Sequence, residues 1–285
     1  MTIEEASSLT LRSGERIFYR GQLSNSEKPI ILLHGLSQQL EYWQPVQQKL
    51  LRSCIAVDLR GHGESQDFDL SSDFSVDRVS QDIIELMDSL RIPSAHIVGH
   101  SWGASIALRI AVTAPLRTES CTLIDGGVFN PRDLIPSAVD STEELRKLLT
   151  PPRGPFTREM LINHYQELDQ ANGSSIMTAV SRTYVDHASG GYVTRLGLER
   201  HMLLLDALIA YDHICDIQKI RVPTWVVNCL AGDYWDQVKA NIVPLLLKNH
   251  LIHVQNWYSC HHDVPLQRPT AVAELISHIA TLTHD

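Results

Sequence analysis

The sequence has few of the features that mark secreted, membrane-spanning or nucleic-acid-binding proteins. Its five cysteines are widely spaced and form no C-x-x-C pair, which fits reduced thiols better than a disulfide framework. Lys and Arg number 24 against 33 Asp and Glu, without a cationic stripe that would neutralise phosphates. No apolar run approaches the length of a membrane span, and the first residues are acidic where a signal peptide is basic. We therefore expect a cytoplasmic protein that binds no nucleic acid and does not insert into a membrane.

Short apolar runs alternate with amphipathic segments along most of the chain. Hydrophobic residues make up 44% of the 285 residues, which is enough for a large core. Near-continuous Ile, Val and Leu content is typical of strands buried on both faces of a parallel sheet. The runs are 29–34, 54–59, 95–100, 121–126, 223–229 and 250–255. The pattern predicts an α/β protein with a mostly parallel sheet flanked by helices.

Two regions depart from this alternation. Residues 9–21, "LTLRSGERIFYRG", indicate a hairpin that turns at Ser13 and Gly14, so we expect the first strands to be antiparallel. From about Val128 to Lys219 we find helical periodicity and Pro-rich joints but no convincing strand. The position of this region between two sheet strands predicts an inserted helical cap. We expect residues 1–127 and 220–285 to form the two parts of the core, and residues 128–219 the cap.

The cap contains aromatic and methionine side chains that are candidates for an acyl pocket, although ordinary packing is the more frequent role of such residues. These are Phe156, Met160, Tyr165, Tyr184, Tyr192 and Met202. Arg195, Arg200 and His201 could contact an acidic group of a substrate, but we favour a solvated helix face for them.

The stretch "IVGHSWGAS", residues 97–105, places Ser101 between two glycines where an apolar run ends and a helical pattern begins. Strand, sharp turn and helix are the context of a nucleophile elbow. Glycines remove side chains that would collide in the turn, so the Ser101 hydroxyl would be exposed. The N–H of Trp102 would then face a developing oxyanion. The G-x-S-x-G pattern is weak alone, but this context makes Ser101 a candidate nucleophile.

Three further stretches make the chain resemble the α/β-hydrolase superfamily over nearly its whole length. They are "LLHGLSQQLEYW" (32–43), "DLRGHGESQ" (58–66) and "CHHDVPLQRPTAVAELI" (260–276). The resemblance implies the α/β-hydrolase fold and a second oxyanion N–H at Leu36. It also implies that His262, before the last helix, is the general base. His261 stands where the family usually has Gly, and we expect it to be a neighbour of the site. His34 and His100 are expected to hold loops together.

Two aspartates compete for the role of the acid that orients the base. Asp233 follows the strand that usually bears this acid in the family, whereas Asp125 follows the preceding strand, where some members carry theirs. The chain order Ser, Asp, His is satisfied by either residue. We prefer Asp233, keep Asp125 as the alternative, and place Asp236 third.

These residues predict a serine hydrolase that cleaves a small or medium acyl substrate through an acyl-enzyme, with a carboxylic ester as first choice. We expect no metal, nucleotide or redox cofactor. The same constellation also serves thioester, lactone, amide or carbon–carbon bond cleavage. A small-ligand receptor with slow or vestigial hydrolysis is the alternative from another class. Serine at the elbow disfavours dehalogenases and epoxide hydrolases, which carry Asp there.

Overall fold

The computed structural model describes residues 6–24, 27–134, 142–150, 152, 154–168 and 180–283. An eight-stranded sheet runs through the core in the order β1-β2-β4-β3-β5-β6-β9-β10. The strands are β1 (Ser7–Thr10), β2 (Arg16–Gln22), β3 (Ile30–Leu33), β4 (Cys54–Asp58), β5 (Ala95–His100), β6 (Thr118–Ile124), β9 (Thr224–Leu230) and β10 (Ile252–Tyr258). β2 pairs antiparallel with β1 and with β4, and the other neighbours are parallel. The mostly parallel sheet and the opening hairpin are therefore confirmed.

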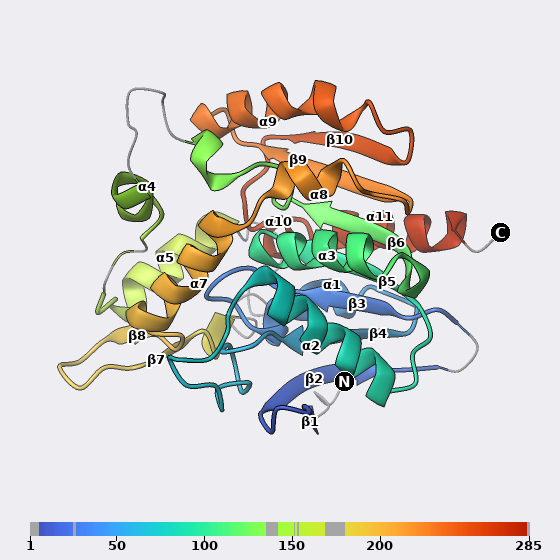
Figure 1. The fold of residues 1–285 in the computed structure, drawn as a ribbon. Coiled ribbons are helices and arrows are strands. Elements are labelled where there is room, and N and C mark those ends of the chain that lie inside the picture. The colour runs from blue at the N-terminus through green and yellow to red at the C-terminus, as the bar shows by residue number, and fades with distance from the viewer. Residues whose placement is uncertain are drawn as a thin grey trace.

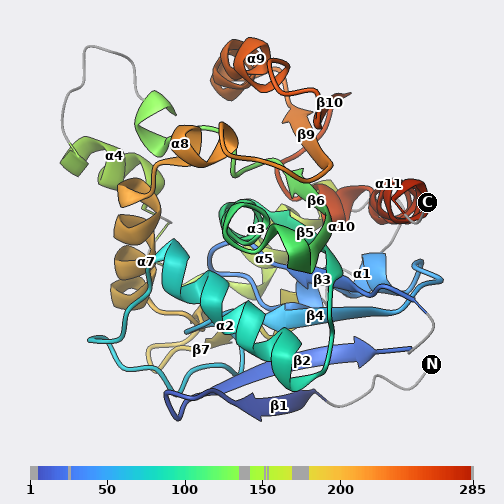
Figure 2. The same cartoon turned by 45° about the vertical axis from the view of Figure 1, so that its right-hand side comes forward.

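Helices cover both faces of the sheet, as Figures 1 and 2 show. One face packs against α2 (Val76–Ser89), α3 (Trp102–Thr113), α8 (His213–Ile217) and α9 (Tyr234–Leu246). The other packs against α1 (Gln44–Gln47), α10 (Val264–Gln267) and α11 (Pro269–Leu282). Every residue of β3, β4 and β5 is buried, as expected for strands covered on both faces. Within the described ranges, no helix is both long and apolar enough to cross a membrane.

Between β6 and α8 the chain leaves the core and forms a cap on one side of it (Figure 1). The cap contains α4 (Thr142–Leu149), α5 (Arg158–Leu168), α7 (Leu198–Ala210) and the antiparallel strands β7 (Tyr184–Asp186) and β8 (Tyr192–Thr194). The expectation that residues 128–219 lack strands is therefore wrong, because three-residue strands are too short to give a periodic signal. Residues 135–141, 151, 153 and 169–179 of this region lie outside the described residues. The outer boundaries of the cap stay a prediction.

Side chains of α7 attach the cap to loops of the core. The Arg200 guanidinium donates to the Phe68 carbonyl at 2.8 Å. The buried His201 ring lies 2.8 Å from the hydroxyl of Ser37, the residue that follows Leu36 in the chain. The solvated helix face expected for these two residues is therefore wrong, because both bind polar groups of the core.

The D-x-R-G stretch after β4 is held by buried polar contacts. The Asp58 carboxylate accepts the amides of Leu40 at 2.7 Å and Glu64 at 2.8 Å. The Arg60 guanidinium donates to both oxygens of Asp82 in α2, at 2.6 and 2.8 Å. These bonds tie the end of β4 to α2 and to the loop before α1.

The Arg60–Asp82 pair yields a stability prediction. Their side chains are 3% and 0% exposed, so Arg60→Met would leave a buried carboxylate with only the partial compensation of Arg78, 3.0 Å away. Breaking a buried pair from one side costs about 3 to 5 kcal/mol, and because Arg78 remains we expect a loss of about 3 kcal/mol. Equilibrium unfolding in urea measures it.

The matched control is Arg16→Met, which breaks an ion pair with Asp67 whose side chains are 51% and 40% exposed. That change should cost less than about 1 kcal/mol. Equal losses in the two variants would contradict a structural role for the Arg60 pair.

Candidate active site

Ser101 stands at the sharp turn between β5 and α3. Its backbone has φ 54° and ψ −118°, and α3 begins at the next residue. A Cβ on Gly99 would lie 2.1 Å from the Gly103 carbonyl oxygen, and one on Gly103 would lie 2.3 Å from the Leu33 carbonyl oxygen. Only glycine fits at either position, because backbone atoms cannot give way. The two glycines therefore permit the turn that lifts Ser101 off the end of the strand.

His262 lies on the loop between β10 and α10 and faces Ser101. Its Nε2 is 3.0 Å from the Ser101 Oγ, and its Nδ1 is 2.7 Å from the Asp125 Oδ2. With the proton on Nδ1, the ring donates to Asp125 and accepts the serine hydroxyl at Nε2. The His100 ring donates from Nε2 to the His262 carbonyl at 2.8 Å, which fixes the loop.

The neighbouring histidine points elsewhere. The His261 Nδ1 accepts the backbone N–H of Asp263 at 3.1 Å, within its own loop. The structure therefore brings His262, and not His261, to Ser101.

Of the two candidate acids, the structure brings Asp125 to His262. Asp125 follows β6 and is buried, with its Oδ1 accepting the Cys229 N–H at 2.9 Å. The Asp233 carboxylate instead accepts the Trp235 N–H at 2.9 Å and caps α9. Asp236 accepts the amides of residues 231 and 232 in the same turn. These contacts reverse the order of preference drawn from the sequence, because α9 begins directly after Asp233 and uses that carboxylate as its cap.

Lys239 of α9 completes the surroundings of Asp125. Its Nζ lies 2.8 Å from the Asp125 Oδ1 and 2.5 Å from the Cys229 carbonyl oxygen. Burial would raise the pKa of Asp125, but the hydrogen bond and charge of His262, together with the charge of Lys239, lower it to about 2. Burial also opposes protonation of His262, yet its bond to Asp125 raises the pKa of this histidine above 6.5. Asp125 is therefore ionised, and it favours a proton on its partner.

Of the two residues proposed to supply the oxyanion amides, Trp102 directly follows Ser101, and Leu36 lies on a loop that approaches it. Trp102 is the first residue of α3, and an N–H at this position has no partner inside the helix. A Cβ on Gly35 would come within 3.1 Å of the Ser101 Cβ, so the loop that carries Leu36 approaches the serine closely. His34 holds this loop, since its Nδ1 donates to the Gly35 carbonyl at 2.8 Å and its Nε2 accepts the Leu59 amide at 3.1 Å.

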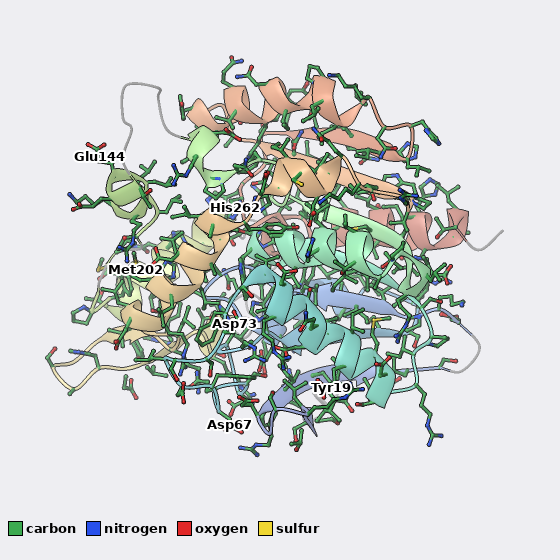
Figure 3. The ribbon with its side chains drawn as sticks, viewed as in Figure 1. Tyr19, Asp67, Asp73, Glu144, Met202 and His262 are labelled. Atoms are coloured by element: carbon green, nitrogen blue, oxygen red, sulfur yellow. The ribbon has the colours of Figure 1, made fainter. Side chains whose placement is uncertain are left out.

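A cavity of about 440 Å³ opens at Ser101 and His262 between the core and the cap. Figure 3 marks His262 in the side-chain view. Most of the lining surface is apolar, and the lining residues come from the segment after β6, from α3, α4, α7, α8 and α9, and from the segments that carry Cys229 and His262. The apolar side chains include Phe129, Pro131, Leu149, Leu208 and Trp235. None of the six cap aromatics and methionines singled out in the sequence is among the lining residues.

The lining residues without a signal in the sequence include Lys239, Cys229 and Cys260. A lysine in a helix is ordinarily a surface residue, and only the pairing of β9 with β10 brings the two cysteines together. Among the described residues, no group of three or more His, Cys, Asp and Glu side chains is arranged to hold a metal ion.

Comparisons with known proteins agree with this fold. The model described as "Alpha/beta hydrolase family" matches residues 30–275. The chain is 20% identical to E-2-(acetamidomethylene)succinate hydrolase, with a TM-score of 0.76 over 97% of this chain and 99% of that one. It is also 20% identical to an esterase from Mycobacterium tuberculosis, with a TM-score of 0.68 over 97% and 91% of the two chains. At these identities the likeness concerns the fold.

Curated relatives match over shorter stretches. The dihydrolipoyllysine-residue acetyltransferase component of the acetoin cleaving system from Pseudomonas putida is 39% identical over 98 residues, which is 34% of this chain and 26% of that protein. A counterpart from Cupriavidus necator aligns over 44% of its own length, so this chain spans less than half of these relatives. The family model, in contrast, takes in the sheet from β3 onward, the turn at Ser101 and the loop of His262, so the chain belongs to the alpha/beta hydrolase family.

Proposed function

We propose that the protein is a serine hydrolase that cleaves a small or medium acyl substrate, a carboxylic ester in the first instance. The observation that carries the proposal is the unbroken series of contacts from Asp125 through His262 to Ser101, at 2.7 and 3.0 Å. A serine hydroxyl is a weak nucleophile at neutral pH and needs a base, and the base needs a carboxylate to hold its tautomer. All three groups are present at hydrogen-bonding distance.

In this mechanism the Ser101 Oγ attacks the substrate carbonyl while its proton passes to the Nε2 of His262. The backbone amides of Leu36 and Trp102 stabilise the oxyanion. The tetrahedral intermediate collapses, and His262 returns the proton to the departing alkoxide. Water then attacks the acyl-enzyme, again with His262 as base, and releases the acid and free Ser101.

The cavity supports an acyl substrate of limited size. A volume of about 440 Å³ falls within the range of small-molecule sites, and its apolar walls suit the hydrocarbon part of an acyl group. The names of the related structures, a succinate-derivative hydrolase and an esterase, agree with acyl chemistry.

All five cysteines are free thiols, which supports our proposal of a cytoplasmic location.

Ser101 and His262 are tested by labelling with a fluorophosphonate probe, read by intact mass, and by hydrolysis of p-nitrophenyl acetate. Ser101→Ala should abolish labelling, and His262→Ala should slow it by about 10⁴-fold or more, because the hydroxyl loses its base. His261→Ala is the matched control and should change the rate little. A folded wild type that is never labelled, or a larger loss in the His261 variant, would contradict the proposal.

Asp125 and Asp233 are separated by the same assay. Asp125→Asn should slow labelling by about 10⁴-fold, because an amide can hold the histidine in the wrong tautomer. Asp233→Asn should leave the rate close to that of the wild type, since asparagine also caps helices. A slow Asp233 variant beside an unaffected Asp125 variant would restore the preference drawn from the sequence.

The raised pKa of His262 sets the pH dependence. Only the neutral imidazole accepts a proton, so the labelling rate should fall as the pH drops through the His262 pKa, with a midpoint above 6.5. The positive charge of Lys239 lowers the pKa of His262, so Lys239→Met should move the midpoint to higher pH. Rate profiles measured between pH 5 and 9 give the midpoints.

Lys239→Arg keeps the charge and should keep the midpoint near that of the wild type. Lys248→Met removes an exposed lysine just after the end of α9, the helix that carries Lys239, and serves as the control. A midpoint that moves to lower pH in Lys239→Met would show that the ion pair does not act on His262 as argued.

A further inference from the structure

Two buried thiols face each other beside the proposed triad. The Sγ atoms of Cys229 and Cys260 are 3.4 Å apart, and each residue is 1% exposed. Cys229 lies near the end of β9, and Cys260 follows β10, the parallel neighbour of β9. The Cys260 N–H donates to the Leu230 carbonyl at 3.2 Å, which continues the pairing of the two segments. The two thiols are therefore held together by the sheet itself.

Each cysteine belongs to a segment that supports one member of the triad. The Cys229 N–H donates to the Asp125 Oδ1 at 2.9 Å, and the Cys229 carbonyl accepts from Lys239. Cys260 lies two residues before His262 on the same loop. A bond between the two sulfurs would therefore connect the support of Asp125 directly to the loop that carries His262.

The pair is placed to react with a small oxidant. Both cysteines are among the residues that line the cavity of Ser101, so a molecule of peroxide size that enters this cavity comes into the neighbourhood of the pair. The hydrogen bond with Cys229 and the charges of Arg268 and Lys239 lower the pKa of Cys260 against burial and the charge of Asp125, whereas the same hydrogen bond and burial raise the pKa of Cys229. A thiolate is the form of cysteine that attacks a peroxide, and cations beside it favour that form.

We propose that Cys229 and Cys260 are an oxidation site, at which hydrogen peroxide converts the two thiols to a disulfide and thereby lowers the reactivity of Ser101. One sulfur attacks the peroxide, the O–O bond breaks, and a sulfenic acid and water form. The second thiol displaces the hydroxyl from this sulfur as a second water, so two thiols and one hydrogen peroxide yield one disulfide and two waters. A thiol reductant reverses the reaction.

The effect on Ser101 rests on the proposed function and follows from distance. A disulfide requires an S–S separation of about 2.05 Å, so the sulfurs must approach each other by more than an ångström from their present 3.4 Å. We expect part of this approach to come from a shift of the backbone at Cys229 or at Cys260, in addition to rotation of the two side chains. Either displacement acts on a segment that fixes the 2.7 Å contact between His262 and Asp125, and small misplacements at such contacts cost up to about 10²-fold in rate.

The test treats the 285-residue chain with hydrogen peroxide and blocks the remaining thiols with N-ethylmaleimide. Non-reducing peptide mapping should find a Cys229–Cys260 disulfide, and the intact mass, measured before the thiols are blocked, should fall by about 2 Da, the two hydrogens lost in the reaction. Fluorophosphonate labelling of the oxidised sample should be at least about tenfold slower than that of the reduced sample, within the range expected for a displaced contact. A thiol reductant should restore it.

Three variants sharpen the result. Cys229→Ser and Cys260→Ser each remove one partner, so peroxide should neither form the bond nor slow the labelling reversibly. Cys215→Ser removes an exposed thiol of α8 and should behave as the wild type. Because wild type and the Cys215 variant retain both partners, the test does not depend on the folding of the other two variants.

Two results would overturn the proposal: the absence of the Cys229–Cys260 disulfide after oxidation, or a disulfide that leaves the labelling rate unchanged. Failure of the proposed function is recognised separately, because the reduced wild type would then show no labelling at all. In that case the peptide map alone decides whether the two thiols are an oxidation site.

Discussion

The carboxylate of Asp125 imposes the constraint on which the site depends. A buried charge without partners costs several kcal/mol or more, so the fold must surround this group with donors. The donors come from three segments: the Cys229 amide at the end of β9, Lys239 of α9, and His262 on the loop after β10. The Cys229 amide and Lys239 therefore compensate the buried charge of Asp125 and at the same time fix the carboxylate that binds His262.

The register of the sheet explains why Ser101 and Asp125 lie close enough to share this histidine. β5 and β6 are parallel neighbours whose last residues, His100 and Ile124, pair with each other. Ser101 directly follows β5, and Asp125 directly follows β6. Both residues have positive φ angles, 54° and 47°, at which the chain leaves the strand direction. Ligands of open α/β sheets bind outside the carboxyl ends of the strands, and this pair lies at that edge. Backbone topology thus brings together the two side chains that His262 joins.

The sequence predicted what depends on local pattern and missed what depends on long-range contacts. Buried strands and the glycines around Ser101 follow from residues close together in the chain, and the resemblance carried by residues 260–276 implied His262 rather than His261. The preference for Asp233 does not match the contacts. Whether this carboxylate caps α9 or binds His262 depends on its position in the fold, which the local sequence does not give. The same holds for Arg200, whose helix pattern indicated a solvated face although its guanidinium reaches a carbonyl of the core. The sequence also did not predict the partners of Lys239, because these contacts depend on how β6 and α9 pack together.

The ion pair of Lys239 and Asp125 also bears on the substrate under the proposed function. Lys239 lines the cavity, but its ammonium is already bound to Asp125 and to the Cys229 carbonyl. Burial lowers the pKa of His213, another lining residue, to about 4, so this ring is neutral near pH 7. An anionic acyl chain would have to compete with Asp125 for Lys239, and success would weaken the contact that holds His262. The electrostatics of the cavity therefore favour a neutral acyl group, because such a group leaves the compensation of Asp125 undisturbed.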